Sequence, residues 1–389
     1  MRYALILGVL FAATTGNAQW EIQPAPTTAD LRGIDNVGKG IAWASGSDGT
    51  VLHTTDDGAH WQLCPTPPDA EKLDFRGIQA FDEKTAIVMS TGKGPLSRLY
   101  KTTDGCRTWH RILKNTDKDG SWVGVIFTDY YDGFLLGEPV HDVFQVRDTN
   151  DHGSTWLYSF SEENPNLHAK STTQRAFAVG ISSLWTRGMS PQPLAFSTGG
   201  VGGSYLYTRT GSVICESASE LLVVTTPCHD EWLRVQVPIG NNNNSSGIYS
   251  FAFKDIGLTS DEYSNITVKK NSLNKTPGIA VGGDSLKPED AAATGAYTFD
   301  GGKTWLVPQT PPHGFRSAVA YDEAAKTWIT VGPNGTDIST DDGRNWRALR
   351  PNPALHEPAD ADRDWNALSL PFVVGPHGRI GRLRPESLK

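Results

Sequence analysis

Apolar and small residues alternate in short segments that recur along the whole chain. These segments begin at residues 31, 75, 122, 248, 315 and 365, with the letters LRGIDN, FRGIQAFD, WVGVIFTD, IYSFAFKD, FRSAVAYD and WNALSL. Other apolar segments end in a glycine, and these glycines are Gly46, Gly92, Gly137, Gly199, Gly283, Gly332 and Gly375. Alternation with a period of two predicts strands with one buried face, and no long segment has the period of an amphipathic helix. The pattern therefore predicts seven groups of strands.

A short segment containing aspartate, glycine and tryptophan is repeated between these strands. Its first copy reads Thr54-x-Asp56-x-Gly58-x-x-Trp61, where x is any residue, and its second copy has Cys106 at the glycine position. The five copies contain Asp56 and Trp61, Asp104 and Trp109, Asp151 and Trp156, Asp300 and Trp305, and Asp341 and Trp346. Internal repeats of this kind indicate a propeller or a solenoid, and the strands between them favour a propeller.

The residue types in the repeated segment suit a structural turn. An aspartate accepts hydrogen bonds from backbone N–H groups, a glycine adopts the positive φ that tight turns require, and a tryptophan buries its ring between neighbouring sheets. A calcium loop needs more oxygen ligands over a longer acidic stretch. A catalytic site would not be copied five times around a ring. We therefore interpret the five copies as structural turns.

We predict an all-β fold, a seven-bladed β-propeller that occupies residues 19–389. The blades are expected at residues 29–64, 73–113, 120–160, 173–239, 246–308, 313–350 and 363–385, with residues 19–24 completing the last blade. That blade lacks an outer strand of its own, and pairing it with the N-terminal segment WEIQ removes exposed sheet edges. The fourth blade lacks a good copy of the repeated turn and carries an insertion. The fifth carries an insertion at about residues 257–277.

The first residues have the layout of a cleaved secretory signal. Residues 1–18 contain one arginine, an apolar run and a small-residue end, so we expect a mature, exported chain, periplasmic or secreted, from Gln19. An oxidising compartment permits disulfides, and the four cysteines allow three connectivities. The first candidate pair is Cys215 with Cys228, because it closes a short local loop. The other two cysteines are Cys64 and Cys106.

Composition and charge exclude several classes of function. The formal net charge is -8, and there is no Lys/Arg run, which argues against nucleic-acid binding. No apolar stretch is long enough to span a bilayer. The sequence has no glycine-rich dinucleotide motif, no haem-attachment motif and no CxxC metal pair. We expect no cofactor, no metal, no membrane insertion and a monomer.

The repeated turns resemble those of Asp-box propellers, which are named after the bacterial neuraminidase repeat. The segments GIYSFAFKD, GIAVGGDSLKPED and TFDGGKTW, together with FRSAVAYD and ITVGPNGTDISTDDGRNW, resemble the family related to the photosystem II stability and assembly factor. The resemblance covers nearly the whole mature chain. It implies a scaffold or assembly role for which the partner is a protein.

One position at the start of each innermost strand is a candidate binding site. It is occupied by Arg32, Arg76, Tyr249, Arg316 and Asn366 in five blades and by Val123 in a sixth, and Arg175 lies near it in blade four. Consecutive blades would bring Arg316, Asn366, Arg32 and Arg76 into one arc at the mouth of the central channel. Clustered guanidinium groups suit carboxylates and other anions. The structural alternative is that each arginine ties its blade to the next.

Two classes of function fit this arrangement. In the first, a non-enzymatic binding or assembly propeller grips an anionic ligand, a saccharide or a partner protein through the arginine arc. In the second, a sialidase-like glycoside hydrolase uses a tyrosine nucleophile assisted by a glutamate and a separate acid. Tyr249, Glu138 and Asp35 are the candidates for that chemistry. The binding propeller is the preferred hypothesis, because these residues are not on suitably neighbouring blades.

Overall fold

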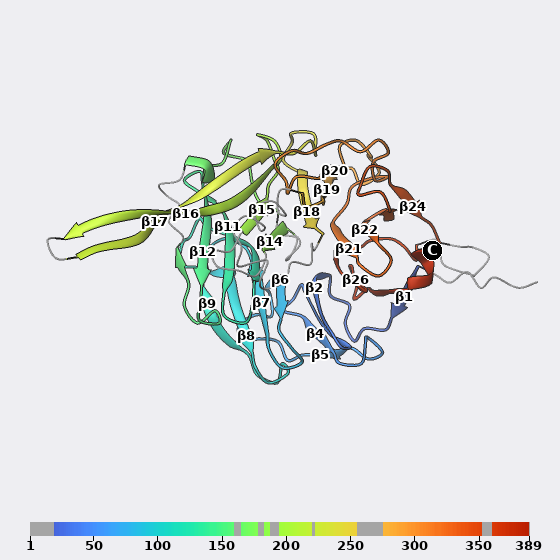
Figure 1. Cartoon of the computed structure of the whole chain (residues 1–389). Helices are drawn as coiled ribbons and strands as arrows, with labels where there is room; N and C mark the ends of the chain where they lie inside the picture. The colour runs from blue at the N-terminus through green and yellow to red at the C-terminus, as the bar shows by residue number, and fades with distance from the viewer. Residues whose placement is uncertain are drawn as a thin grey trace, which may run out of the picture.

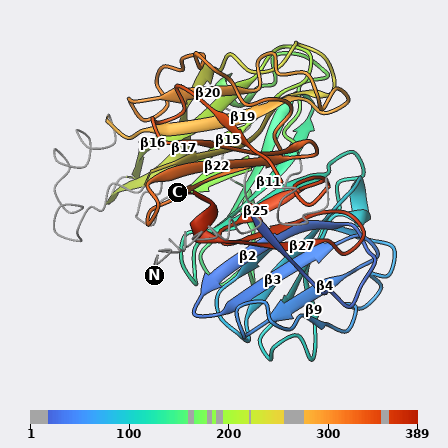
Figure 2. The same cartoon turned by 90° about the vertical axis from the view of Figure 1, so that its right-hand side faces the viewer.

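The computed structural model is an all-β molecule with seven sheets arranged around one axis (Figure 1). It describes residues 19–158, 165–177, 183–186, 194–219, 222–254, 275–351 and 360–388, and the side chains of residues 210–230 and 386 fall outside that description. Neighbouring strands in each blade are antiparallel. Seen from the side, the blades are twisted sheets around the axis (Figure 2). The predicted seven-bladed propeller is thus confirmed.

Each blade is one sheet whose strands follow one another from the centre outward. The first three blades contain β2 (Leu31–Gly38), β3 (Ile41–Gly46), β4 (Val51–Thr54) and β5 (Gln62–Leu63); β6 (Asp74–Ala80), β7 (Ala86–Thr91), β8 (Arg98–Thr102) and β9 (His110–Lys114); and β10 (Trp122–Phe127), β11 (Gly133–Val140), β12 (Val143–Thr149) and β13 (Leu157–Tyr158). The next three contain β14 (Leu184–Thr186), β15 (Leu194–Ser197), β16 (Tyr205–Ser219) and β17 (Leu222–Gln236); β18 (Ser246–Phe253), β19 (Gly278–Asp284) and β20 (Gly295–Thr298); and β21 (Ala318–Asp322), β22 (Thr327–Gly332), β23 (Gly335–Ser339) and β24 (Arg347–Leu349).

The last blade joins the two ends of the described chain. Its strands are β25 (Ala367–Ser369), β26 (Phe372–Val374), β27 (Ile380–Leu383) and, outermost, β1 (Trp20–Gln23). Strands β1 and β27 are antiparallel, and their register runs from Trp20 opposite Leu383 to Gln23 opposite Ile380. Because Trp20 is buried and its indole N–H donates to Asp362 Oδ1 at 3.1 Å, β1 is also tied to the segment that precedes β25. The predicted closure by an N-terminal outer strand is correct.

Two blades depart from the four-stranded pattern. Strands β16 and β17 of blade four have 15 residues each and form a ribbon that extends well beyond the ring (Figure 1). This ribbon is the insertion expected in the fourth blade, and the proposed pairing of Cys215 with Cys228 lies on it, outside the described side chains. Blade five has three strands, with a single bridge between Tyr297 and Leu306 in place of a fourth. The insertion expected near residues 257–277 lies almost wholly outside the described residues.

Hydrophobic side chains fill the spaces between adjacent blades. One cluster combines Trp43 and Val51 of blade one with Phe75, Val88 and Tyr100 of blade two, and all five are buried. Burial of apolar area of this kind is the main driving force for folding. A disulfide between Cys64 and Cys106 also joins these two blades, and it is the pair that remains when Cys215 is paired with Cys228.

The repeated turn has one geometry in all five copies. In the first copy, the Thr54 hydroxyl donates to Asp56 at 2.9 Å and accepts from the Gly58 N–H at 3.1 Å, while the His60 N–H donates to Asp56 at 2.9 Å. The other four turns contain the same three bonds. The residue at the glycine position of the turn has a positive φ, which is 84° at Gly58. Each aspartate therefore closes its own turn.

Candidate functional site

The candidate residues lie where the innermost strands begin, on the side of the ring that we call the top face. The pairing of the innermost strand with the next one shifts register at Arg32, Arg76, Val123 and Tyr249 in blades one, two, three and five. Such a shift is a β-bulge, and bulges re-aim side chains and occur beside functional sites. The repeated position recognised in the sequence is thus a repeated bulge.

Arg32 and Arg76 share one carboxylate. Arg76 Nε lies 2.8 Å from Asp74 Oδ2, and Arg32 Nε lies 3.5 Å from Asp74 Oδ1. Arg32 also contacts Asp30, with Nη2 at 3.4 Å from Oδ2. All four side chains are partly exposed, so these ion pairs contribute little to stability. Two positive charges and two negative charges therefore alternate across blades one and two.

Arg175 is different from these two arginines. Its backbone pairs with Gly199 at the start of blade four, and the residue is exposed. Its guanidinium has no hydrogen-bond or ion-pair partner among the described residues. Burial raises the pKa of Glu138 to about 7, and the charge of Arg175 acts in the opposite direction. Arg175 is consequently a cation beside a carboxyl group that is only partly ionised near neutral pH.

Tyr249 brings the candidate residues of different blades together. Its ring stacks on Phe177, with centroids 4.2 Å apart, and its hydroxyl lies 3.0 Å from the Ser285 hydroxyl. Burial raises the pKa of Tyr249, whereas the positive charges of Arg175 and Arg76 lower it. Both guanidinium groups therefore lie close enough to act on this phenol. Arg76, Arg175 and Tyr249, from blades two, four and five, are thus coupled electrostatically.

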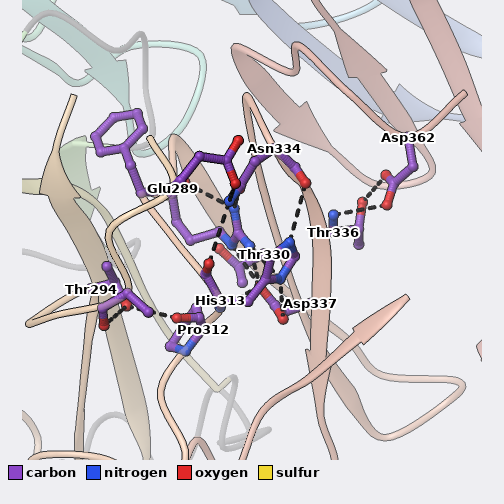
Figure 3. A network of polar contacts seen from close by, with 12 residues as sticks. Glu289, Thr294, Pro312, His313, Thr330, Asn334, Thr336, Asp337 and Asp362 are labelled. Carbon is purple, nitrogen blue, oxygen red and sulfur yellow. Dashed lines mark hydrogen bonds and ion pairs between the residues drawn. The ribbon is translucent and has the colours of Figure 1, made fainter. Parts of the chain in front are cut away.

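Arg316 does not join this group, and the prediction that it lies in an accessible arc is wrong. The side chain is fully buried and bonds to Asp337 and Asn334. Figure 3 shows these two partners together with His313. His313 completes the network, with Nδ1 at 2.8 Å from Asp337 Oδ1. Burial acts to raise the pKa of Asp337, but His313 and Arg316 outweigh it, and the pKa is lowered. Arg316 is thus a structural cation inside blade six.

Asn366 also ties blades together. Its side-chain amide donates to the Leu31 carbonyl of blade one at 2.8 Å, and its backbone N–H donates to the Val374 carbonyl at 2.7 Å. Arg316 and Asn366 therefore have structural roles, within and between blades, which fit their contacts better than ligand binding does. Arg32, Arg76, Arg175 and Tyr249 remain as the candidate site, which we call the top-face cluster.

Asp35 lies toward the other end of β2, away from this cluster. It is buried and accepts hydrogen bonds from the Ala80 N–H at 2.7 Å and from Gln79 at 3.0 Å. Burial raises the pKa of Asp35 to about 6. Its contacts explain it as a link between blades one and two. It is not placed to act with Tyr249.

Sequence reasoning missed the acidic partners of the arginines. Asp30 and Asp74 each stand two residues before an arginine, as Asp-Leu-Arg and Asp-Phe-Arg, and this repeated spacing was visible in the sequence. Phe177 was also missed, because its stacking on Tyr249 joins blades four and five across a long sequence separation.

The described residues contain no group of three His, Cys, Asp or Glu side chains that could hold a metal ion. Nor does any helix within the described ranges have the length and apolar character needed to cross a membrane.

No protein-family model and no curated protein sequence matches this chain. Among solved structures, the chain is similar to YCF48 bound to a D1 peptide, with a TM-score of 0.54, 14% identity, and coverage of 95% of this chain and 96% of that one. YCF48 from Cyanidioschyzon merolae gives a TM-score of 0.54 at 18% identity, over 95% of this chain and 100% of that one.

A third similar structure is the extracellular domain of the putative one-component system BT4673 from B. thetaiotaomicron. It gives a TM-score of 0.54 at 10% identity, over 94% of this chain and 40% of that one. At such identities the similarity shows the fold alone. The chain is a seven-bladed β-propeller. The particular propellers that it resembles over nearly their full length include the two YCF48 structures.

Proposed function

We propose that this protein is an exported, non-enzymatic binding propeller that holds an acidic segment of a partner protein at the top-face cluster. The observation that carries the proposal is Arg175, an exposed guanidinium without an ion-pair partner among the described residues, whose charge acts with that of Arg76 on the Tyr249 phenol. A guanidinium grips a carboxylate bidentately, and an aromatic ring next to it provides a flat apolar contact.

Two further observations support this function. The disulfide between Cys64 and Cys106 is of a kind that persists in oxidising compartments, in keeping with export. One of the similar solved structures is YCF48 bound to a D1 peptide, so this propeller architecture is compatible with peptide binding. These two points and the top-face cluster support the role of a scaffold for another protein.

A sialidase-like hydrolase is less well supported. A tyrosine nucleophile needs a lowered pKa or an adjacent base, whereas burial raises the pKa of Tyr249 and its hydroxyl contacts Ser285 and the Ser245 carbonyl. The buried position of Arg316 also removes one guanidinium from the set that would hold a sugar carboxylate.

The test is a titration of fluorescently labelled acidic hexapeptides, followed by anisotropy. We expect binding that weakens as the salt concentration rises and that falls about tenfold or more in Arg175→Ala, since a charged hydrogen bond is lost. The matched control is Arg107→Ala, because Arg107 is also exposed but belongs to a repeated turn of blade two. Equal affinity of the wild type and Arg175→Ala for every peptide would contradict the proposal.

A further inference from the structure

The two chain ends that close the ring also border an open pocket of about 340 Å³. Ile22 and Ala25 line it from β1 and the loop after it, and Asp364, Pro376, His377 and Arg379 line it from the last blade. Pockets of this size are large enough to hold a ligand group. Because its walls come from both ends of the chain, the pocket exists only while the ring is closed.

Backbone contacts hold the two walls against each other. The Gly378 N–H donates to the Ala29 carbonyl at 2.7 Å, and the turn approaches so closely that a Cβ at Gly378 would lie 2.0 Å from the Thr27 carbonyl oxygen. Gly378 also has φ of 71°, which disfavours any residue with a side chain. The pocket is therefore a built feature of the closure.

One residue links the lining of the pocket to the top-face cluster. Asp30 accepts from the His377 backbone N–H at 3.2 Å with one carboxylate oxygen and contacts Arg32 at 3.4 Å with the other. The loop that contains Asp30 leads directly into β2, and the turn that contains His377 joins β26 to β27, so both lie on the top face. Arg32 of the top-face cluster is thus linked to the His377 turn of the pocket through the Asp30 carboxylate.

The lining of the pocket matches a peptide better than a free ion. Ile22, Ala25 and Pro376 provide an apolar wall, and Ile22 is 48% exposed although it is a large hydrophobic residue. Arg379 is held over the Trp365 ring, 4.8 Å from its centroid, and contributes a donor, whereas Asp364 contributes an acceptor. One cation and one anion leave no net preference for charge. A peptide supplies a carbonyl, an N–H and an apolar side chain together.

We infer that this pocket receives an aliphatic side chain of the peptide that the top-face cluster holds, and that it sets the specificity of binding. The inference rests on the proposed function. In this arrangement the arginines bind the acidic side chains of the peptide, and the pocket selects which peptide sequence is bound. It also couples binding to ring closure, because a ligand that binds only the closed form stabilises that form.

The experiment measures affinities of an acidic hexapeptide library in which one position at a time is varied over all side chains. The wild type is expected to prefer leucine, isoleucine or methionine over alanine at one position by about tenfold or more, as the burial of several methylene groups implies. In Ile22→Asp this ratio should fall to about one. Leu63→Asp is the matched control, because Leu63 is 47% exposed on the outer strand of blade one and does not line the pocket.

The outcomes separate the pocket from the function on which it rests. Acidic peptides that bind without any aliphatic preference would overturn the pocket and leave the proposed function standing. An aliphatic preference that Ile22→Asp retains would also overturn the pocket. Failure of every acidic peptide to bind would overturn the proposed function and this inference with it.

Discussion

Cys106 and Cys64 form a disulfide across the boundary between blades one and two. Cys106 stands at the position that glycine occupies in the other four repeated turns, and it has φ of 60° where Gly58 has 84°. A Cβ at Gly58 would meet Gln23 and Phe372 of the preceding blade. This position of the turn therefore faces the preceding blade, and a cysteine placed there links to that blade covalently.

We predict that the double variant Cys64→Ala/Cys106→Gly folds but is less stable. The disulfide closes a segment with a sequence separation of 42 residues. The chain-entropy account gives about 4 kcal/mol for such a loop, and a loss of about 2–4 kcal/mol is expected. Denaturant unfolding with and without reductant measures it. Cys106→Gly restores the residue used by the other turns, so an undiminished stability would mean that the disulfide does not constrain the unfolded chain.

Trp20 should hold the closing strand in place. Its ring is buried, and its N–H donates to Thr336 at 3.0 Å and to Asp362 at 3.1 Å. Trp20→Ala should lower the free energy of unfolding by about 3–5 kcal/mol through the cavity it leaves. Trp20→Phe keeps most of the apolar contact and should cost about 1–3 kcal/mol through lost hydrogen bonds. Urea unfolding tests both, and wild-type stability in Trp20→Ala would contradict the closure by β1.

The aspartates of the repeated turns should make the protein sensitive to acid. Hydrogen bonds from the residue four positions later lower the pKa of Asp56, Asp104 and Asp151 to about 2. A carboxyl group whose pKa is lower in the folded state stabilises that state at pH values above its unfolded pKa of 3.8. This stabilisation is lost as the pH falls toward 2.

We expect the fraction of folded protein, followed by near-ultraviolet circular dichroism, to fall between about pH 4 and pH 2. Asp104→Ala should already be less stable at pH 7 and show a weaker dependence on pH across this window. Asp104→Asn keeps an acceptor oxygen and should lie between that variant and the wild type. An unchanged acid transition in Asp104→Ala would contradict the role given to this carboxylate.

Variants of Arg316 and Arg175 should distinguish a structural arginine from one that binds a partner. Arg316→Ala leaves Asp337 buried without its main partner and should cost about 3–5 kcal/mol of stability. Arg175→Ala removes an exposed side chain and should change stability by less than about 0.5 kcal/mol. Thermal unfolding of the two variants side by side gives the comparison, and similar losses would show that the two arginines have the same role.

The fold was predictable because its signals are local. The aspartate, glycine and tryptophan of each turn act within a few residues, as the bonds of Asp56 and Gly58 show. The closing strand was also readable, since WEIQ lies just before the first blade and the last blade lacks an outer strand.

The candidate site was only partly predictable, because partners far apart in the sequence decide what each arginine does. Arg175, near the start of blade four, is exposed, whereas Arg316, near the start of blade six, is buried and bonds to Asp337, which lies 21 residues further on. The disulfide between Cys64 and Cys106 is the complement of the pair Cys215 with Cys228 that short spacing favoured, so it is compatible with that prediction. Its geometry, however, depends on packing between blades one and two.

The most direct test of the central claim is a charge reversal at Arg175. Labelled hexapeptides of opposite charge are titrated against the wild type and Arg175→Glu at low salt. The account predicts that the wild type binds the acidic peptide more tightly, and that Arg175→Glu loses this preference and favours the basic peptide, because like charges at an interface repel. An acidic preference that survives the reversal would contradict the assignment of binding to the top-face cluster.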